Sequence, residues 1–349
     1  MIPKDLGYSM PAEWKKHRGT WTTYPQAYET FFDRLEEARE EFVQMVKYVS
    51  LGETVHINVD NEEVKKDLIK RLEKYDVKGD VQIHIIPTND AWCRDYGAIF
   101  VKNKEEKLLA LDFRFNAWGG KYPYDLDDKV ARKMAEILGV DVLSVDMVLE
   151  GGSIDVNGNG CLLTTESCLL NPNRNPDMSK EEIEEALKNY LGVEKILWLK
   201  EGIVGDDTDG HIDDITRFVN ENTIVTVIEE DEKDPNYEPL MENFERLKSF
   251  TDINENPFEI ITLPMPDPVY YKYPDSKEEE RLPASYANFY ISNTAVIVPV
   301  FNCDKDKIAL ETLQKLFPDR AVIGIYAYDI LVGLGAFHCL TQQIPEGKF

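Results

Sequence analysis

Alternating hydrophobic and polar positions, separated by segments with helical spacing, divide most of this chain into a repeating series of strands and helices. Two strand-like runs, Ser153–Asn157 and Cys161–Thr165, flank a Gly-Asn-Gly sequence that is typical of a hairpin turn. Ser179 and Glu182 then form a capping-box pattern, which predicts the start of a helix. After that helix, Lys195–Leu199 reads as another strand. These segments predict a unit of hairpin, helix and strand.

The same order recurs at Arg94–Val145, Ile215–Leu263 and Tyr286–Ile325, with a period of roughly 60 residues. The first 85 residues contain two more predicted helices and form a less regular fifth unit. Such a period favours a cyclic array in which each unit buries one face against its neighbours. An ordinary α+β sheet with coincidental spacing is the alternative. Since no linker-like segment interrupts the chain, we expect an α/β protein with one domain over residues 1–349.

Charge narrows the possible functions. The 349 residues include 65 acidic and 39 basic side chains, for a formal net charge of −26. Nucleic-acid binding needs clustered Lys and Arg, so it is not expected, whereas a small cationic partner suits this charge. No run reaches the ~18 apolar residues of a membrane helix, and the N-terminus lacks the apolar core of a signal peptide. The five cysteines are scattered, which is typical of a reducing compartment, so we expect a cytoplasmic protein.

The segment Gly205–Asp214 is chemically unusual because it places five carboxylates around the imidazole of His211. Asp is a poor strand former, and like charges at this spacing repel one another. A solvated acidic loop, a metal site and a site for a cationic substrate are the alternatives. The segment has neither a second nearby histidine nor the ligand spacing of an EF-hand, so we predict no metal here.

Other candidate reactive groups stand at the beginning of successive predicted hairpins. They are Asp95, Glu150, His211 with Asp213, and Cys339 in a glycine-rich approach. In a cyclic array such equivalent positions converge, so residues distant in sequence would share one pocket. His211 and Asp213, two positions apart, are expected on one face of a strand. The alternatives are a small core residue at Cys339 and a simple tight turn at Glu150.

Six ordered motifs resemble the agmatine deiminase family, and the resemblance extends from Tyr8 to Pro345. They are Trp92-x-Arg94-Asp95-x-Gly97, Phe115–Gly120, Glu150–Gly152, Gly205–Asp213, Pro283–Tyr290 and His338–Pro345. That family belongs to the guanidino-group-modifying superfamily, with bacterial-type peptidylarginine deiminases as close relatives. The resemblance implies a five-bladed α/β propeller whose site lies at the pseudo-fivefold axis.

The resemblance also implies roles for individual residues, in a reaction without metal or cofactor. Cys339 corresponds to the nucleophile, His211 to the general acid/base and Glu150 to the residue that orients it. Asp95 and Asp213 correspond to the pair that holds the guanidinium. Trp92 and Trp118 correspond to the lining of the aliphatic arm, and Asp207 to the partner of the distal amine. One departure is the segment Gly333–Phe337, where the family usually has Gly-Gly-Gly-Asn-Ile.

The expected activity is hydrolysis of agmatine to N-carbamoylputrescine and ammonia, which belongs to putrescine and polyamine biosynthesis. Deimination of arginine or another guanidino compound is the main alternative, and amidino transfer to an amine is a weaker one. A non-enzymatic, acidic cation-binding repeat protein would belong to a different class. Such a protein would have no use for Cys339 or His211. The sequence leaves the oligomeric state open, and a homo-oligomer is compatible with it.

Overall fold

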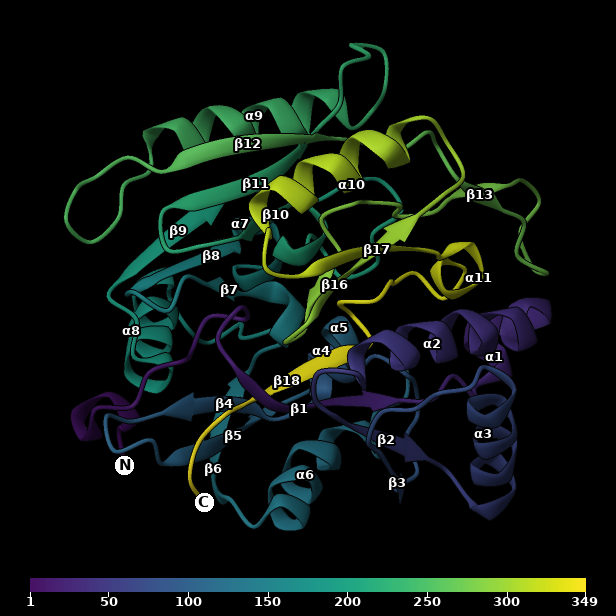
Figure 1. Ribbon diagram of the computed structural model, residues 1–349. Helices are drawn as coiled ribbons and strands as arrows, with labels where there is room; N and C mark the ends of the chain where they lie inside the picture. Colours follow the sequence, from purple (N-terminus) through teal and green to yellow (C-terminus); the bar gives the residue numbers. More distant parts are fainter.

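The computed structural model describes residues 1–349 and contains six separate β-sheets with helices around them (Figure 1). Four sheets have three strands each and share one construction. In each, the first strand runs antiparallel to the central strand, and the third, reached through a helix, runs parallel to it. The predicted order of hairpin, helix and strand is therefore observed.

The strands of these four sheets are, in order, β4 (Ile99–Lys102), β5 (Leu108–Arg114) and β6 (Asp141–Val148); β7 (Asp155–Val156), β8 (Cys161–Thr165) and β9 (Lys195–Leu199); β10 (Thr216–Phe218), β11 (Thr223–Ile228) and β12 (Glu259–Pro264); and β15 (Tyr290–Ile291), β16 (Ala295–Val300) and β17 (Ala321–Tyr326). The crossover helices are α6 (Val130–Leu138), α8 (Lys180–Leu191), α9 (Tyr237–Ser249) and α10 (Lys305–Leu316).

The fifth large sheet joins the two ends of the chain. Its four strands have the order β18 (Thr341–Pro345), β1 (His17–Thr23), β2 (Thr54–Val59) and β3 (Val81–Ile85), with α2 (Leu35–Val49) and α3 (Glu62–Lys74) as crossovers. Strand β18 pairs antiparallel with β1, and Figure 1 shows the two side by side although they come from opposite ends of the sequence. The less regular unit predicted from the first 85 residues thus lacks one strand that the C-terminal segment supplies.

The remaining elements are short. They are β13 (Tyr270–Tyr271) and β14 (Glu280–Arg281), which form a two-stranded sheet, the helical turns α1 (Tyr28–Phe31), α4 (Cys93–Tyr96), α5 (Ala117–Gly120), α7 (Glu166–Leu169) and α11 (Tyr328–Leu331), and the 3₁₀ turns η1 (Pro3–Leu6), η2 (Phe32–Arg34), η3 (Asp127–Lys129), η4 (Gly151–Ser153) and η5 (Ile212–Asp214).

Hydrophobic side chains join neighbouring sheets into shared cores. Every residue of the central strand β8 is buried, so β8 packs on both of its faces. One cluster of 20 buried residues combines the sheets β4–β6 and β7–β9, and a cluster of 26 combines β8 and β9 with the two sheets that follow. Helix α8 contributes Ile183, Leu187 and Leu191 from one face, and its predicted capping box between Ser179 and Glu182 is present. The α/β class is confirmed, and no sheet closes on itself.

Several predicted strands begin later than expected, and two of these differences fall at candidate site residues. Cys93–Tyr96 forms a helical turn, and the strand predicted from Arg94 begins only at Ile99. Ile212–Asp214 forms a 3₁₀ turn, so His211 and Asp213 do not lie on a strand, and that expectation was wrong. Turns suit these segments because Asp side chains bond to nearby backbone groups rather than fit a pleated surface.

None of the helices is both long and apolar enough to cross a membrane.

Candidate active site

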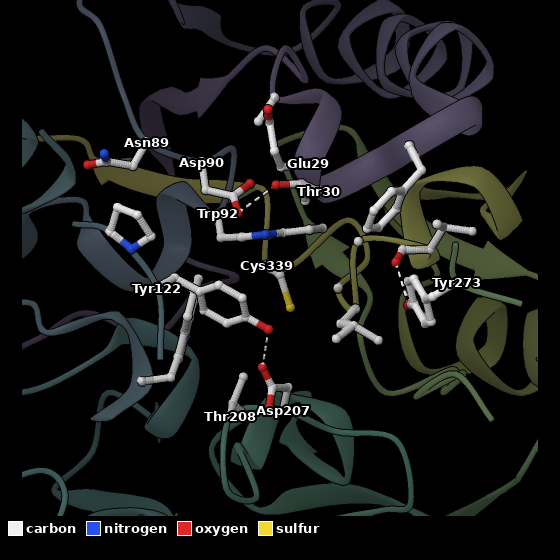
Figure 2. A pocket seen from close by; sticks show the side chains of 18 of the residues that line it. Glu29, Thr30, Asn89, Asp90, Trp92, Tyr122, Asp207, Thr208, Tyr273 and Cys339 are labelled. Atoms are coloured by element: carbon white, nitrogen blue, oxygen red, sulfur yellow. Dashed lines mark hydrogen bonds between the residues drawn. The ribbon is translucent and has the colours of Figure 1, made fainter. Parts of the chain in front are cut away.

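A cavity of about 610 Å³ contains Cys339 in its wall (Figure 2). Its lining comes from segments far apart in the sequence, including α1, the Trp92–Asp95 turn, the acidic loop after β9 and the Val332–Gly335 loop. The lining includes six carboxylic acids and no Lys, Arg or His, and the acids are Glu29, Asp90, Asp95, Asp207, Asp275 and Glu280. Since low-dielectric walls strengthen such a negative field, the cavity is suited to a cationic ligand.

The side chain of Asn288 holds the segment around Cys339. Its Nδ2 donates to Cys339 Sγ at 3.1 Å, while its Oδ1 accepts the backbone N–H of His338 at 3.0 Å. Cys339 is 6% exposed, and its Sγ lies 3.8 Å from Oδ2 of Asp213. Burial, followed by the charges of Asp213, Asp214 and Asp95, raises the pKa of the Cys339 thiol well above its usual value. A cation between the thiol and these carboxylates would oppose that rise and favour the thiolate.

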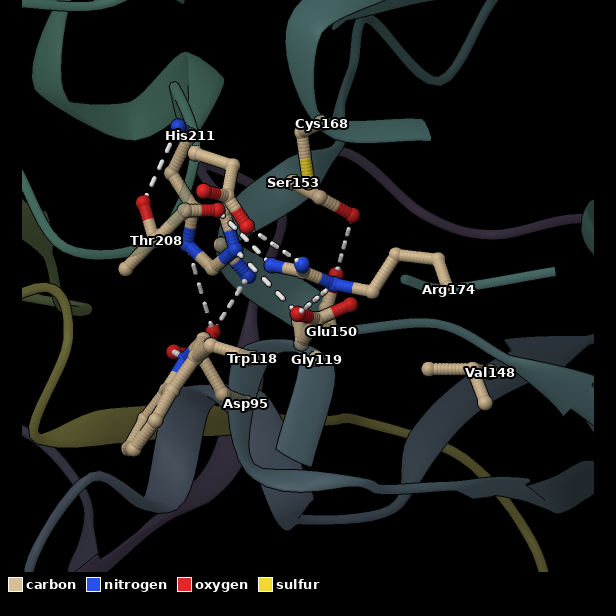
Figure 3. A network of polar contacts seen from close by, with 12 residues as sticks. Asp95, Trp118, Gly119, Val148, Glu150, Ser153, Cys168, Arg174, Thr208 and His211 are labelled. Atoms are coloured by element: carbon tan, nitrogen blue, oxygen red, sulfur yellow. Dashed lines mark hydrogen bonds and ion pairs between the residues drawn. The ribbon is translucent and has the colours of Figure 1, made fainter. Parts of the chain in front are cut away.

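His211 is fully buried between two carboxylates (Figure 3). Its Nδ1 lies 3.7 Å from Oδ1 of Asp95, and its Nε2 lies 3.8 Å from Oε1 of Glu150. Burial alone would lower the pKa of this imidazole, but Asp95, Cys168 and Glu150 raise it well above its usual value. The neighbouring carboxylates thus favour the protonated form of His211, which could give a proton to a leaving group.

Arg174 fixes Glu150 and the acidic loop together, a contact that the sequence analysis missed. Its Nε donates to Oε1 of Glu150 at 2.7 Å, its Nη1 to Oδ2 of Asp209 at 2.7 Å and its Nη2 to the carbonyl of Thr208 at 2.7 Å. Burial opposes ionisation of Glu150, but contacts with His211 and Arg174 lower its pKa below the usual value. No local sequence pattern pairs Arg174 with Glu150, because the need of a buried carboxylate for a cationic partner does not say which residue meets it.

Each carboxylate oxygen of Asp95 accepts one hydrogen bond from the protein. Oδ2 accepts from Nε1 of Trp118 at 2.9 Å, and Oδ1 accepts from the backbone N–H of Gly152 at 2.9 Å. Burial, together with the charges of Asp213 and Glu150, raises the pKa of Asp95 to about 6, although His211 and Trp118 oppose the rise. The residue is therefore ionised at neutral pH and protonated under mildly acidic conditions.

Gly152 lies where three candidate residues meet. A Cβ at this position would lie 2.6 Å from Nδ1 of His211, 2.8 Å from Oδ1 of Asp95 and 3.0 Å from Oδ2 of Asp213. A real Cβ essentially never comes as close as the first two distances, so only glycine fits here. The Glu150-Gly-Gly sequence is thus more than a tight turn, because it allows these groups to converge.

Asp213 is held by a buried chain of polar contacts that leads to the N-terminal segment. Its Oδ2 lies 2.6 Å from Nδ1 of His338, whose Nε2 lies 2.7 Å from Oε2 of Glu13. Glu13 also contacts Arg94 at 3.3 Å and Arg217 at 3.0 Å. The other oxygen of Asp213, Oδ1, is buried and has no hydrogen-bond partner within the protein. That oxygen is available to accept an N–H group from a ligand beside Cys339.

The remaining predicted residues lie along the cavity wall. Trp92 packs against the loop that leads to Cys339, and Figure 2 shows its ring above the sulfur. Asp207 is half-buried and accepts a hydrogen bond from the hydroxyl of Tyr122 at 2.6 Å, and Nζ of Lys121 lies 3.5 Å from its Oδ1.

Five predicted residues line the cavity directly, namely Trp92, Asp95, Trp118, Asp207 and Cys339. The other three, Glu150, His211 and Asp213, are fully buried and contact members of this wall or one another.

Two clusters have donor atoms close enough to share a metal ion, Glu150 with Cys168 and His211, and Asp213 with Asp214 and Cys339. In each cluster, one carboxylate already contacts a cationic or hydrogen-bonding side chain, Arg174 or His338. A metal ion would have to displace or tolerate these partners, so the donor sets fit a metal poorly. A metal-free site remains our prediction.

Comparisons with known proteins identify the family of this chain. The model of the Porphyromonas-type peptidyl-arginine deiminase family matches residues 9–345, so the chain belongs to that family. It is similar to a protein of Latilactobacillus sakei that is provisionally named an agmatine deiminase, with 38% identity and coverage of 99% of this chain and 98% of the relative. The resemblance noted from the sequence motifs is confirmed.

Two solved structures resemble the whole chain. The agmatine deiminase of Enterococcus faecalis has 35% identity and a TM-score of 0.93, with 99% of this chain and 98% of that chain covered. A C. jejuni agmatine deiminase with a Cys-to-Ser change and bound substrate has 36% identity and a TM-score of 0.88, with 97% of both chains covered. Fold and family are thus established together over nearly the full length.

Proposed function

We propose that this protein is an agmatine deiminase, which hydrolyses agmatine to N-carbamoylputrescine and ammonia. The observation that carries the proposal is the position of the Cys339 sulfur beside Asp213 and Asp95, in a cavity lined by six carboxylic acids and no basic side chain. The family membership and the similar agmatine deiminases support it. Catalysis would need neither a metal nor a cofactor.

Substrate binding prepares the attack. The planar guanidinium donates paired N–H bonds to Asp95 and Asp213, and the partnerless Oδ1 of Asp213 is one acceptor. This arrangement holds the guanidinium carbon next to Sγ of Cys339, which replaces a bimolecular encounter by a fixed geometry. The positive charge of the substrate also lowers the pKa of the thiol, so the nucleophile forms when substrate is bound.

The reaction then proceeds in two halves. The Cys339 thiolate forms a C–S bond, His211 donates its proton to the departing nitrogen, and breaking the C–N bond releases ammonia and leaves an amidino-cysteine adduct. A water molecule next loses a proton to His211 and attacks the same carbon. The C–S bond breaks, the thiolate returns, and the ureido product leaves. Glu150 keeps the imidazole charged and in place through its contact with Nε2.

The distal end of the substrate decides between agmatine and arginine. The ammonium group of agmatine suits the half-buried carboxylate of Asp207, whereas the carboxylate of free arginine would face the same negative field. The indoles of Trp92 and Trp118 would cover the methylene arm between the two ends. Arginine or another guanidino compound remains the alternative substrate.

Several further properties belong to the same proposal. The five large sheets would surround a pseudo-fivefold axis as five blades, with the site at the axis and the whole of residues 1–349 acting as a single catalytic domain. The shared hydrophobic clusters between neighbouring sheets support this arrangement. We also propose a cytoplasmic enzyme that binds no nucleic acid, which the net charge of −26 and the scattered cysteines support. A homo-oligomer is compatible with the sequence.

The test measures ammonia and ureido product from agmatine, arginine and a blocked arginyl peptide, with and without iodoacetamide. Turnover of agmatine alone, abolished by the thiol reagent, is expected. Turnover of arginine instead would retain the mechanism and reject the substrate. Activity that survives iodoacetamide but is lost to a chelator would favour a metal-dependent hydrolase, and no activity with any guanidine would favour a cation-binding protein.

A further inference from the structure

Leu334 has a backbone conformation that leucine rarely adopts. Its φ angle is +71°, in the left-handed region that favours glycine or asparagine. The residue follows α11 in a tight turn, in which the N–H of Leu334 donates to the carbonyl of Leu331 at 2.8 Å. A side chain kept at such a position costs stability, so an observed outlier of this kind suggests a functional reason.

The residues on both sides of Leu334 hold the turn against the indole of Trp92. A Cβ on Gly333 would lie 2.7 Å from Cζ2 of Trp92, and a Cβ on Gly335 would lie 2.5 Å from Cζ3. Neither flanking position can therefore carry a side chain without displacing the ring. Leu334 is the one residue of this Gly-Leu-Gly segment that presents a side chain.

The Leu334 side chain lines the same cavity as Cys339 and Trp92. It is half-buried and packs against the small hydrophobic cluster that contains Leu331 and Val332. It therefore gives an apolar surface to a wall that leads to the nucleophile, inside a cavity otherwise dominated by carboxylates and aromatic rings.

We propose that Leu334 is a specificity-determining residue that selects guanidines with an unbranched methylene arm. This inference rests on the proposed function, since it concerns the arm of the same substrate. Methylene groups of the arm pack against the Leu334 side chain and lose contact with water, which favours binding. A substituent on the carbon that bears the distal amine collides with this wall, because the turn is held by Trp92 and cannot retreat.

Argininamide separates this steric selection from charge repulsion. It has the guanidinium, methylene arm and amine of agmatine, and it adds a neutral carboxamide at the branching carbon. The experiment measures kcat/KM for agmatine and argininamide with the wild type, Leu334→Gly and Leu334→Ala. We expect the ratio of argininamide to agmatine to rise at least tenfold in both variants, mainly through a higher KM for agmatine and a lower KM for argininamide.

Asp76→Gly is the matched control, because Asp76 also has a positive φ, of 54°, but lies on the surface outside the cavity lining. Its substrate ratio should equal that of the wild type. A ratio that stays within twofold of the wild type in both folded Leu334 variants would overturn the inference while leaving agmatine hydrolysis intact. If the wild type itself hydrolyses no guanidine, the proposed function fails first, and the selection by Leu334 fails with it.

If Leu334→Gly does not fold, Leu334→Ala decides the question, since it retains a Cβ and removes only the apolar wall. Folding is checked by thermal denaturation. We expect Leu334→Gly to melt no lower than Leu334→Ala, because glycine accommodates the positive φ.

Discussion

The guanidinium of Arg174 donates from Nε to Oε1 of Glu150 over 2.7 Å, and the side chains of both residues are completely buried. A guanidinium thus forms a permanent part of the site that we propose to bind and hydrolyse another guanidinium. The internal one contacts Glu150 and the acidic loop, whereas Cys339 contacts Asp213 and Asn288. The fixed cation favours the ionised form of Glu150 beside His211.

Removing Arg174 alone should damage both stability and turnover. Arg174→Met leaves the Glu150 carboxylate buried without its guanidinium partner, which is expected to cost about 3–5 kcal/mol of unfolding free energy. Glu150→Gln combined with Arg174→Met removes both charges and should recover part of that loss. Urea denaturation of the two single variants and the double variant measures the coupling. Strictly additive losses would contradict a direct interaction between the two side chains.

Replacing the proposed nucleophile should abolish turnover and preserve the fold. Cys339→Ser retains the size of the side chain but offers a much weaker nucleophile at neutral pH, so we expect kcat to fall by at least about a thousandfold. Cys303→Ser is the control, since Cys303 lies outside the cavity and should leave activity unchanged. Steady-state rates with agmatine and matching circular dichroism spectra check both expectations. Undiminished turnover by Cys339→Ser would reject covalent catalysis at this residue.

The acid limb of the pH profile should report Asp95. In the proposed mechanism its carboxyl must be ionised to hold the guanidinium, and its pKa is raised to about 6, first by burial and then by neighbouring carboxylates. We therefore expect kcat/KM for agmatine to fall about tenfold per pH unit below pH ~6. Trp118→Phe removes the N–H that stabilises the carboxylate, so the acid limb should move to higher pH. An unchanged limb would assign the transition to another group.

Glu13 should support stability in a pH-dependent way. Burial disfavours its charge, but Arg217, His338 and Arg94 lower its pKa well below the usual value. Because this pKa is lower in the folded protein, the stabilisation is complete above the unfolded-state value of about 4.3 and is lost as the pH falls toward the folded-state value. Glu13→Gln should therefore be less stable than the wild type at pH 7, by about 3 kcal/mol, with a smaller difference near pH 4. Chemical denaturation at both pH values measures this difference.

Sequence patterns predicted the repeating units well, because hydrophobic periodicity and capping residues act locally. Ser179 and Glu182 form the expected capping box, and the four three-stranded sheets have the expected order of elements. The pairing of β18 with β1 was not predictable in this way, since no local signal records which distant strand completes a sheet. The strand expected at His211 failed for a related reason, because the carboxylates near it bond to backbone groups in turns.

The sequence motifs identified eight candidate residues that lie in one region of the folded chain. They did not identify the buried side chains that contact these residues and their neighbour His338. Arg174, Glu13 and Asn288 are buried partners of Glu150, His338 and Cys339, and each contact joins segments separated by 24 to 325 residues. Such partners follow from the need to compensate buried charge, and only the folded chain identifies which residue does so.

The pairing of β18 with β1 has a consequence for how the protein is made. A chain interrupted before Thr341 lacks the strand that covers the outer edge of β1, and that edge then presents unpaired N–H and C=O groups to other molecules. Cys339 lies two residues before the same strand, so synthesis supplies the proposed nucleophile and the protection of this edge almost simultaneously. A truncation at this point is therefore expected to favour association through the edge of β1, and one that also removes Cys339 would lack the proposed nucleophile.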